Sequence, residues 1–289
     1  MVLAAPLRRR DLGGLLSCGA VLLVAGCAPG PAAVATADDV PRDPLAHLDE
    51  VRWDGRTCAD VLALPIRGDA AELDSWEPLG DDDAVLDPTR RALIDFLETA
   101  YLSPEALAGL DPAAALELVS AAAPSYWREQ LAEAWDDGER HVHGFALGPG
   151  FATIGRPALA MDWYRAELEG APVLLLGGTI AWSVVDVDSH AVGVVAYRTG
   201  IVAHLDTGED LGAATSATLR VTVHGLDTCG VREADGLVVP ALADTAEHHA
   251  AQQETTDSVI ASPRLTQEDL LDPGSPLLSG DDATNVLCA

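Results

Sequence analysis

Apolar positions recur with a helical spacing in the first half of the chain and with an alternating spacing in the second half. One helical stripe runs from Leu93 to Tyr101, and another repeats every four residues as Trp127, Leu131 and Trp135. Stripes of this kind are typical of helices that face a core, and a ligand-binding role for the aromatic stripe is the alternative. The pattern therefore predicts core-facing helices that precede the strands in the chain.

Turn-forming residues mark where these helices start and stop. Asp87-Pro88, Ser103-Pro104 and Asp111-Pro112 each place a capping residue before a proline that suits the first helical turn. Gly138 follows the aromatic stripe and predicts a helix end.

The second half predicts strands. The expected strands are residues 141–147, 151–154, 173–187, 191–205, 217–226 and 237–242, and residues 158–168 fit a helix or a strand. Within residues 217–226, Leu219, Val221 and Val223 point to one side, which leaves Arg220 and its neighbours Thr222 and His224 on the other. One buried and one polar face is typical of an antiparallel sheet, so these polar residues are expected to face solvent.

Helices followed by an antiparallel meander predict an α+β domain, in which N-terminal helices precede a curved antiparallel sheet of four to six strands. We expect this single domain to span residues 50–243 and residues 244–289 to form a polar, largely disordered tail. A short amphipathic piece near residues 265–271 is the part of the tail expected to dock.

The first residues resemble a bacterial lipoprotein signal peptide. Arg8, Arg9 and Arg10 precede an apolar run that is too short to span a bilayer comfortably, and Val24-Ala25-Gly26-Cys27 follows. The resemblance implies that residues 1–26 are removed, that Cys27 carries the lipid, and that residues 27–49 are a flexible tether. An ordinary cleaved signal or an uncleaved anchor is the alternative, and Arg9-Arg10 fits either twin-arginine export or general secretion.

The charged residues exclude several classes of function. All 17 basic residues are arginines, and removal of residues 1–26 leaves 14 of them against 45 acidic residues, a net charge of −31. Such a surface repels phosphate backbones, so we expect no nucleic-acid partner. The absence of lysine excludes Schiff-base and pyridoxal-phosphate chemistry, and we expect no cofactor.

The cysteines that remain after export of a lipidated chain are Cys58, Cys229 and Cys288, because Cys18 leaves with the signal peptide. Three cysteines in an exported protein allow one disulfide. Spacing does not decide the pairing; we favour Cys58 with Cys229, because Cys288 lies in the expected tail, and Cys58 with Cys288 is the alternative.

The order of elements over residues 88–242 is similar to the nuclear-transport-factor-like, or SnoaL-like, cone fold. This resemblance implies a pocket between the sheet and the helices that binds a small apolar ligand or, in some members, uses an Asp/His pair for proton transfer. The candidates for such a pocket are Asp162, Trp163, Tyr197, His204 and His224.

A metal site is a weaker hypothesis. His141 and His143 would share a face of the expected strand at residues 141–147, but no third ligand lies nearby in sequence, so we expect no bound metal.

Together these features favour a lipid-anchored protein on the extracytoplasmic face of the cell membrane, acting as a non-enzymatic binding or accessory module of the envelope. Its partner would be an envelope protein or a small apolar ligand. A small isomerase or hydrolase with an Asp/His pocket is the alternative. No catalytic residue is assigned from the sequence.

Overall fold

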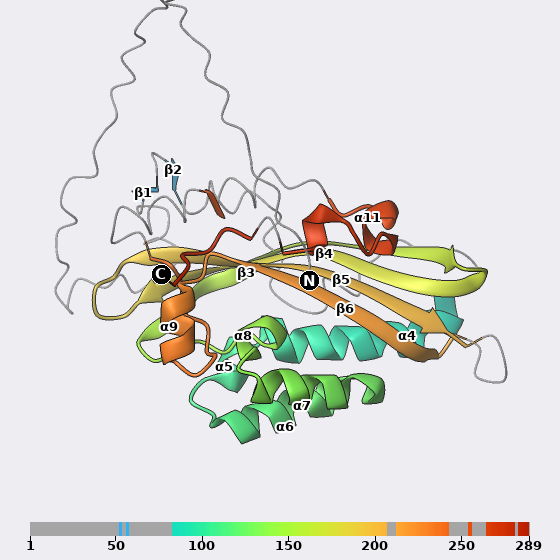
Figure 1. Cartoon of the computed structure of the whole chain (residues 1–289), viewed down its shortest axis with the longest axis horizontal. Coiled ribbons are helices and arrows are strands. Elements are labelled where there is room, and N and C mark those ends of the chain that lie inside the picture. Colours follow the sequence, from blue (N-terminus) through green and yellow to red (C-terminus); the bar gives the residue numbers. More distant parts are fainter. Residues whose placement is uncertain are drawn as a thin grey trace, which may run out of the picture. The chain divides into compact units, whose positions relative to one another are not determined.

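The computed structural model describes residues 52–53, 56–57, 83–206, 212–242, 254–255, 264–280 and 283–288. All of them fall within one structural unit of the chain, Val34–Ala289. The expected signal peptide, Cys27, the expected tether and Cys58 lie outside the described residues. Within the described part, helices come first and strands follow, which confirms the α+β class (Figure 1).

The strands form a four-stranded antiparallel sheet whose order equals their order in the chain, β3-β4-β5-β6. Their bounds are β3 Phe151–Leu168, β4 Ala171–Asp186, β5 Val192–Leu205 and β6 Ala214–His224. A separate two-stranded pair joins β1 (Arg52–Trp53) to β2 (Arg56–Thr57). The expected strands at residues 173–187, 191–205 and 217–226 are therefore confirmed as β4, β5 and β6.

Strand β3 resolves the uncertain region at residues 151–168. It is one long edge strand, and its pairing with β4 shifts register between Ile154 and Ala158. Pro157 lies at this irregularity, where an edge strand tolerates a residue that has no N–H to donate.

Two expected strands are wrong. Residues 140–143 form helix α8 (Arg140–His143), after which Phe145 donates its backbone N–H to Ala100 rather than to the sheet. Residues 237–242 make only single bridges, Val238 to Leu147 and Pro240 to Leu226. In the second segment Val238 and Leu242 are buried without forming a strand ladder, whereas Val142 in the first is only partly buried.

The helices before the sheet are α4 (Asp83–Leu97), η2 (Glu98–Leu102), α5 (Pro104–Leu107), α6 (Pro112–Ala122), η3 (Ser125–Trp127) and α7 (Arg128–Asp136). Figure 1 shows α4, α6 and α7 on one side of the sheet, which we name the helical face. Asp111 caps α6 by accepting from the Ala114 N–H, as expected, and Gly138 follows α7 with a φ of +81°.

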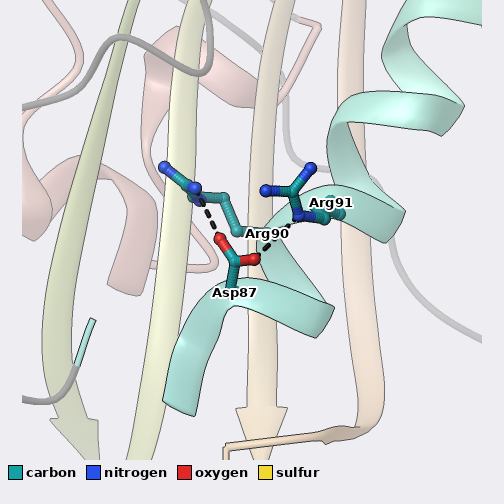
Figure 2. Close-up of polar contacts among 3 residues, drawn as sticks. All are labelled: Asp87, Arg90 and Arg91. Carbon is teal, nitrogen blue, oxygen red and sulfur yellow. Dashed lines mark hydrogen bonds and ion pairs between the residues drawn. The ribbon is translucent and has the colours of Figure 1, made fainter. Parts of the chain in front are cut away.

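Asp87 is not the cap that the sequence predicted. Helix α4 begins at Asp83 and contains Pro88, and Leu86 in its first turns is buried in the core. The Asp87 carboxylate instead bonds forward to Arg90 at 2.5 Å and Arg91 at 2.7 Å (Figure 2). These two hydrogen bonds, the one from Arg91 above all, lower the pKa of Asp87.

The core on the helical face is aromatic. Trp182 stacks on Phe145 with a centroid distance of 5.4 Å, and its indole N–H donates to the Tyr101 carbonyl at 2.8 Å. Phe96 meets Trp127 edge-on at 5.0 Å. All of these side chains are buried, so the helical layer and the sheet share one core.

The opposite side of the sheet, which we name the tail face, carries the C-terminal elements. These are α11 (Gln267–Leu271) and η4 (Pro276–Leu278). Leu270 and Leu278 pack there with Val173, Leu175 and Val202, in a second apolar cluster that also contains Leu265. The amphipathic piece near residues 265–271 therefore docks as expected, and the described parts of residues 264–288 are packed rather than loose.

Candidate binding pocket

The sequence-predicted pocket residues do not share a pocket. Strand alternation places Trp163 and Tyr197 in the core of the helical face, whereas Asp162, His204 and His224 have the opposite parity in their strands and belong to the tail face. Asp162 is on edge strand β3 and His224 is on the other edge strand, β6. The sheet itself therefore separates Trp163 and Tyr197 from the other three candidates. Asp162 and His224, which share a face, are on opposite edges of the sheet.

Tyr197 is a core residue. Its ring contacts Tyr101 at 5.1 Å and Phe145 at 5.8 Å, and its side chain is fully buried. Burial raises the pKa of Tyr197 well above its usual value, so the phenol stays neutral. Trp163, on β3 of the same face, is 7% exposed and belongs to the same core cluster.

His224 is buried, so the expectation that the polar side of β6 faces solvent is wrong for its last residues. His224 is 2% exposed and Thr222 is 4% exposed. Imidazole Nδ1 accepts from the Thr284 backbone N–H at 3.3 Å and lies 3.3 Å from the Thr284 hydroxyl. The segment that ends the chain therefore covers a position that alternation alone would leave exposed.

The charge state of His224 follows from this setting. Burial, helped by the positive charge of Arg198, lowers the pKa of His224 to about 4. Since Nδ1 accepts from a backbone N–H, the proton of the neutral ring is on Nε2, which has no hydrogen-bond partner among the described residues. No hydrogen bond in the described part of the chain joins His224 to a carboxylate, so an Asp/His proton-transfer pair is not formed here.

The other two candidates have surface positions. Asp162 pairs with Arg264 at 3.1 Å, which ties β3 to the segment that leads into α11. His204 is partly exposed and lies opposite Val173 on one neighbouring strand and Ser216 on the other. Neither residue joins a cluster of groups suited to catalysis.

His141 and His143 do not form the shared face that the sequence suggested. They lie on α8, and helical residues two apart point in different directions. Burial lowers the pKa of both imidazoles, against a smaller opposing effect of Glu139. Among the described residues, no group of three or more His, Cys, Asp or Glu is arranged to hold a metal ion.

The disulfide joins Cys229 to Cys288, and the favoured pairing of Cys58 with Cys229 is wrong. Residues near the C-terminus run beside the end of β6, where Val286 donates to the Leu226 carbonyl and accepts from the Thr228 N–H. These backbone bonds bring Cys288 to Cys229 at the start of α9 (Thr228–Glu233). No period in the sequence reveals such a pairing, so the sequence alone predicts a loose tail around Cys288.

A pocket of about 200 Å³ opens elsewhere, between the helical layer and the turn that follows α9. Most of its lining is apolar. The lining residues are Leu107, Leu110, Pro112, Ala115, Trp135, Arg140, Ala146, Ala234, Asp235 and Leu237. They come from α5, α6, α7 and α8 and from the segments that follow α5, α8 and α9, which meet around one hollow.

Tight turns hold the pocket together. Asp235 and Gly236 follow α9 with φ values of +56° and +81°, and a Cβ on Gly236 would lie 2.5 Å from the Gly138 carbonyl oxygen. Only glycine therefore fits this crossing of two chain segments. On the opposite wall, the Trp135 indole N–H donates to the Pro112 carbonyl at 3.0 Å and fixes the ring.

One ion pair lies at the pocket. Arg140 Nη2 bonds Asp235 at 2.9 Å, with the arginine side chain 11% exposed and the aspartate side chain 77% exposed. Arg140 Nε is buried and has no hydrogen-bond partner among the described residues. The pocket thus offers an apolar surface and one ion pair, and its lining holds no pair of groups with catalytic geometry.

Sequence reasoning missed this pocket. The aromatic stripe predicts that Trp135 lies in the core, which is correct for most of its surface, since it is 3% exposed. The usable signal lay in the turn residues Gly138 and Asp235-Gly236, but their meeting depends on segments that are about a hundred residues apart.

None of the described helices is long and apolar enough to cross a membrane. In comparisons with protein-family models, curated proteins and solved structures, none matches this chain.

Proposed function

We propose that this protein is a lipoprotein, anchored through Cys27 to the extracytoplasmic face of the cell membrane, and that it acts there as a non-enzymatic binding module of the envelope. The anchor is supported by the sequence Val24-Ala25-Gly26-Cys27 after a short apolar run. Two or three acyl chains on one cysteine, at about 0.8 kcal/mol for each buried methylene, hold a protein at a membrane.

The pocket carries the binding half of the proposal. Its lining is mostly apolar, and its two ionised groups, Arg140 and Asp235, neutralise each other. A hydrolase or isomerase needs a proton donor and acceptor that converge on one substrate atom. His224, the most buried of the candidate histidines, has Thr284 and not a carboxylate as its neighbour. These features favour recognition over chemistry.

Intact-mass spectrometry of protein extracted from membranes tests the anchor. We expect a chain that starts at Cys27 and carries the mass of the lipid. Cys27→Ser should abolish the lipid mass and leave the signal peptide attached, whereas Cys18→Ser, a matched change inside the removed segment, should leave the mature mass unchanged. A wild-type chain that is cut at another residue and carries no lipid would refute the proposal.

A further inference from the structure

The size of the pocket restricts what it can hold. Pockets that enclose a small-molecule ligand measure roughly 300–1,000 Å³, and this one measures about 200 Å³. It is also open, because Leu110 and Asp235 line it and remain 39% and 77% exposed respectively. Single anchoring side chains at protein interfaces fill hollows of this kind.

The lining chemistry fits such an anchor. Leu110 is among the few large apolar side chains that the described surface exposes, and it lines the pocket together with buried Trp135. The buried Arg140 Nε–H has no acceptor among the described residues.

Exposed acidic residues lie next to the lining residues of the pocket in the chain. Each of them is exposed and either lines the pocket or directly adjoins a lining residue in the chain; we name them the acidic rim: Asp111, Asp136, Glu139, Glu233 and Asp235. Arg140 itself is the only arginine at those positions, and it is paired with Asp235. With a net charge of −29 for the whole chain, the field at this site attracts positive charge.

We propose that this pocket is the docking site for a positively charged segment of a partner protein, which inserts one large apolar side chain between Leu110 and Trp135 while its arginines or lysines face the acidic rim. This inference rests on the proposed function as a binding module and specifies the chemistry of the partner. The apolar anchor supplies most of the affinity, and the rim charges supply orientation and rate of encounter.

The test uses the full chain in detergent micelles and three labelled peptides, with binding followed by fluorescence anisotropy. The first peptide has one phenylalanine flanked on each side by two arginines, the second has alanine in place of phenylalanine, and the third has glutamates in place of the arginines. We expect the first peptide to bind at least about tenfold more tightly than the second. The third peptide should show no binding.

Matched variants locate the site. Leu110→Ser should weaken binding of the phenylalanine peptide about tenfold. Leu118→Ser, at a leucine that is 36% exposed but does not line the pocket, should leave it unchanged. Glu139→Gln combined with Glu233→Gln should weaken binding at low salt, whereas Glu98→Gln combined with Glu167→Gln, at exposed positions away from the rim, should have a much smaller effect.

Several outcomes would overturn the proposal. Equal binding of the phenylalanine and alanine peptides would mean attraction by charge alone, and binding that Leu110→Ser leaves intact would place the site elsewhere. If neither arginine peptide binds and Leu110→Ser dissociates a dimer of this chain, the occupant is a second copy. The lipid mass on Cys27 is read separately, so a lipidated chain that ignores the peptides refutes this inference and leaves the anchor standing.

Discussion

The two faces of the sheet are buried in different ways. On the helical face, large rings such as Trp182, Tyr197 and Phe145 pack against several helices. On the tail face, Gly177 and Gly200 receive the leucines of α11 and η4, and polar residues such as Thr222 are also buried. The helical face is filled by large aromatic side chains. On the tail face, glycines allow the C-terminal elements to lie close to the sheet, and polar contacts hold them there.

The polar contacts explain how a short C-terminal segment remains in place. Arg220 on β6 donates to the carbonyls of Leu270 and Asp272, at 2.5 and 2.6 Å. These carbonyls are at the end of α11, where no backbone N–H of the helix is available to them. Asn285 donates to the Val223 carbonyl and accepts from the Leu226 N–H, and so extends the edge of β6. The tail face is thus stabilised by directed bonds that apolar patterning does not predict.

Adjacent residues of β4 provide the sharpest test of the difference between faces. Trp182→Ala removes a stacked ring from the helical face and should cost about 3–5 kcal/mol in the free energy of unfolding. Ser183→Ala, one residue away on the tail face, removes a buried hydroxyl that has no partner among the described residues. It should change stability by less than about 0.5 kcal/mol or raise it. Denaturant unfolding measures both, and comparable losses would contradict the contrast.

Loss of the disulfide should weaken the hold of the C-terminal segment. Cys229 and Cys288 are 59 residues apart, and the chain-entropy model gives about 4 kcal/mol for a loop of this length. Cys288→Ser should therefore lower the unfolding free energy by roughly this amount and expose residues 283–288 to hydrogen exchange. Cys58→Ser is the control, and it should leave the bond intact by peptide mapping. A Cys58-linked peptide in wild-type protein would overturn the pairing.

His224 makes the tail face sensitive to acid. Its pKa is about 4 in the folded protein and about 6.5 in the unfolded chain, so the unfolded state binds the proton first as the pH falls. The stabilisation is complete above pH 6.5 and decreases between pH 6.5 and 4, by about 3 kcal/mol in total. Unfolding at several pH values should show this component in wild type and not in His224→Asn.

The comparison of the two proteins isolates one group, because His141 and His143, whose pKa values are also lowered by burial, contribute equally to both. Parallel pH curves for wild type and His224→Asn would show that His224 is not buried in the neutral form.

The smallest expected effect concerns the fit of α11 on the sheet. A Cβ on Gly177 would lie 2.4 Å from Leu270 Cδ2, the far end of a flexible side chain, so Gly177→Ala should cost about 1–2 kcal/mol as α11 shifts. Gly274→Ala meets only one side-chain atom, of Asp272 at 3.4 Å, and is the control. Limited proteolysis of residues 264–280 should accelerate for the first variant, and equal rates would show that the leucine adjusts without undocking.

The sequence predicted what local chemistry decides. Alternation located β4, β5 and β6, and the pair Asp111-Pro112 located the start of α6, because both signals act between neighbouring residues. It failed at residues 140–143, where a helix replaces the expected strand. A segment of four residues shows too little periodicity to distinguish a helix from a strand, and its packing in the fold makes the choice.

The predicted environment of the candidate pocket residues was wrong for a related reason. Alternation correctly put Leu219, Val221 and Val223 on one face and His224 on the other, but it does not say what covers each face. His224 is buried because Thr284, sixty residues later, binds it.

The sequence by itself determined the α+β class, the order of the elements and the register of alternation, since these depend on the spacing of side chains along one segment. Only the tertiary structure decided the Cys229–Cys288 bond, the burial of His224 and the pocket at Arg140 and Asp235. Each of these joins segments that are far apart in the chain, through contacts whose energy exists only after the layers have packed.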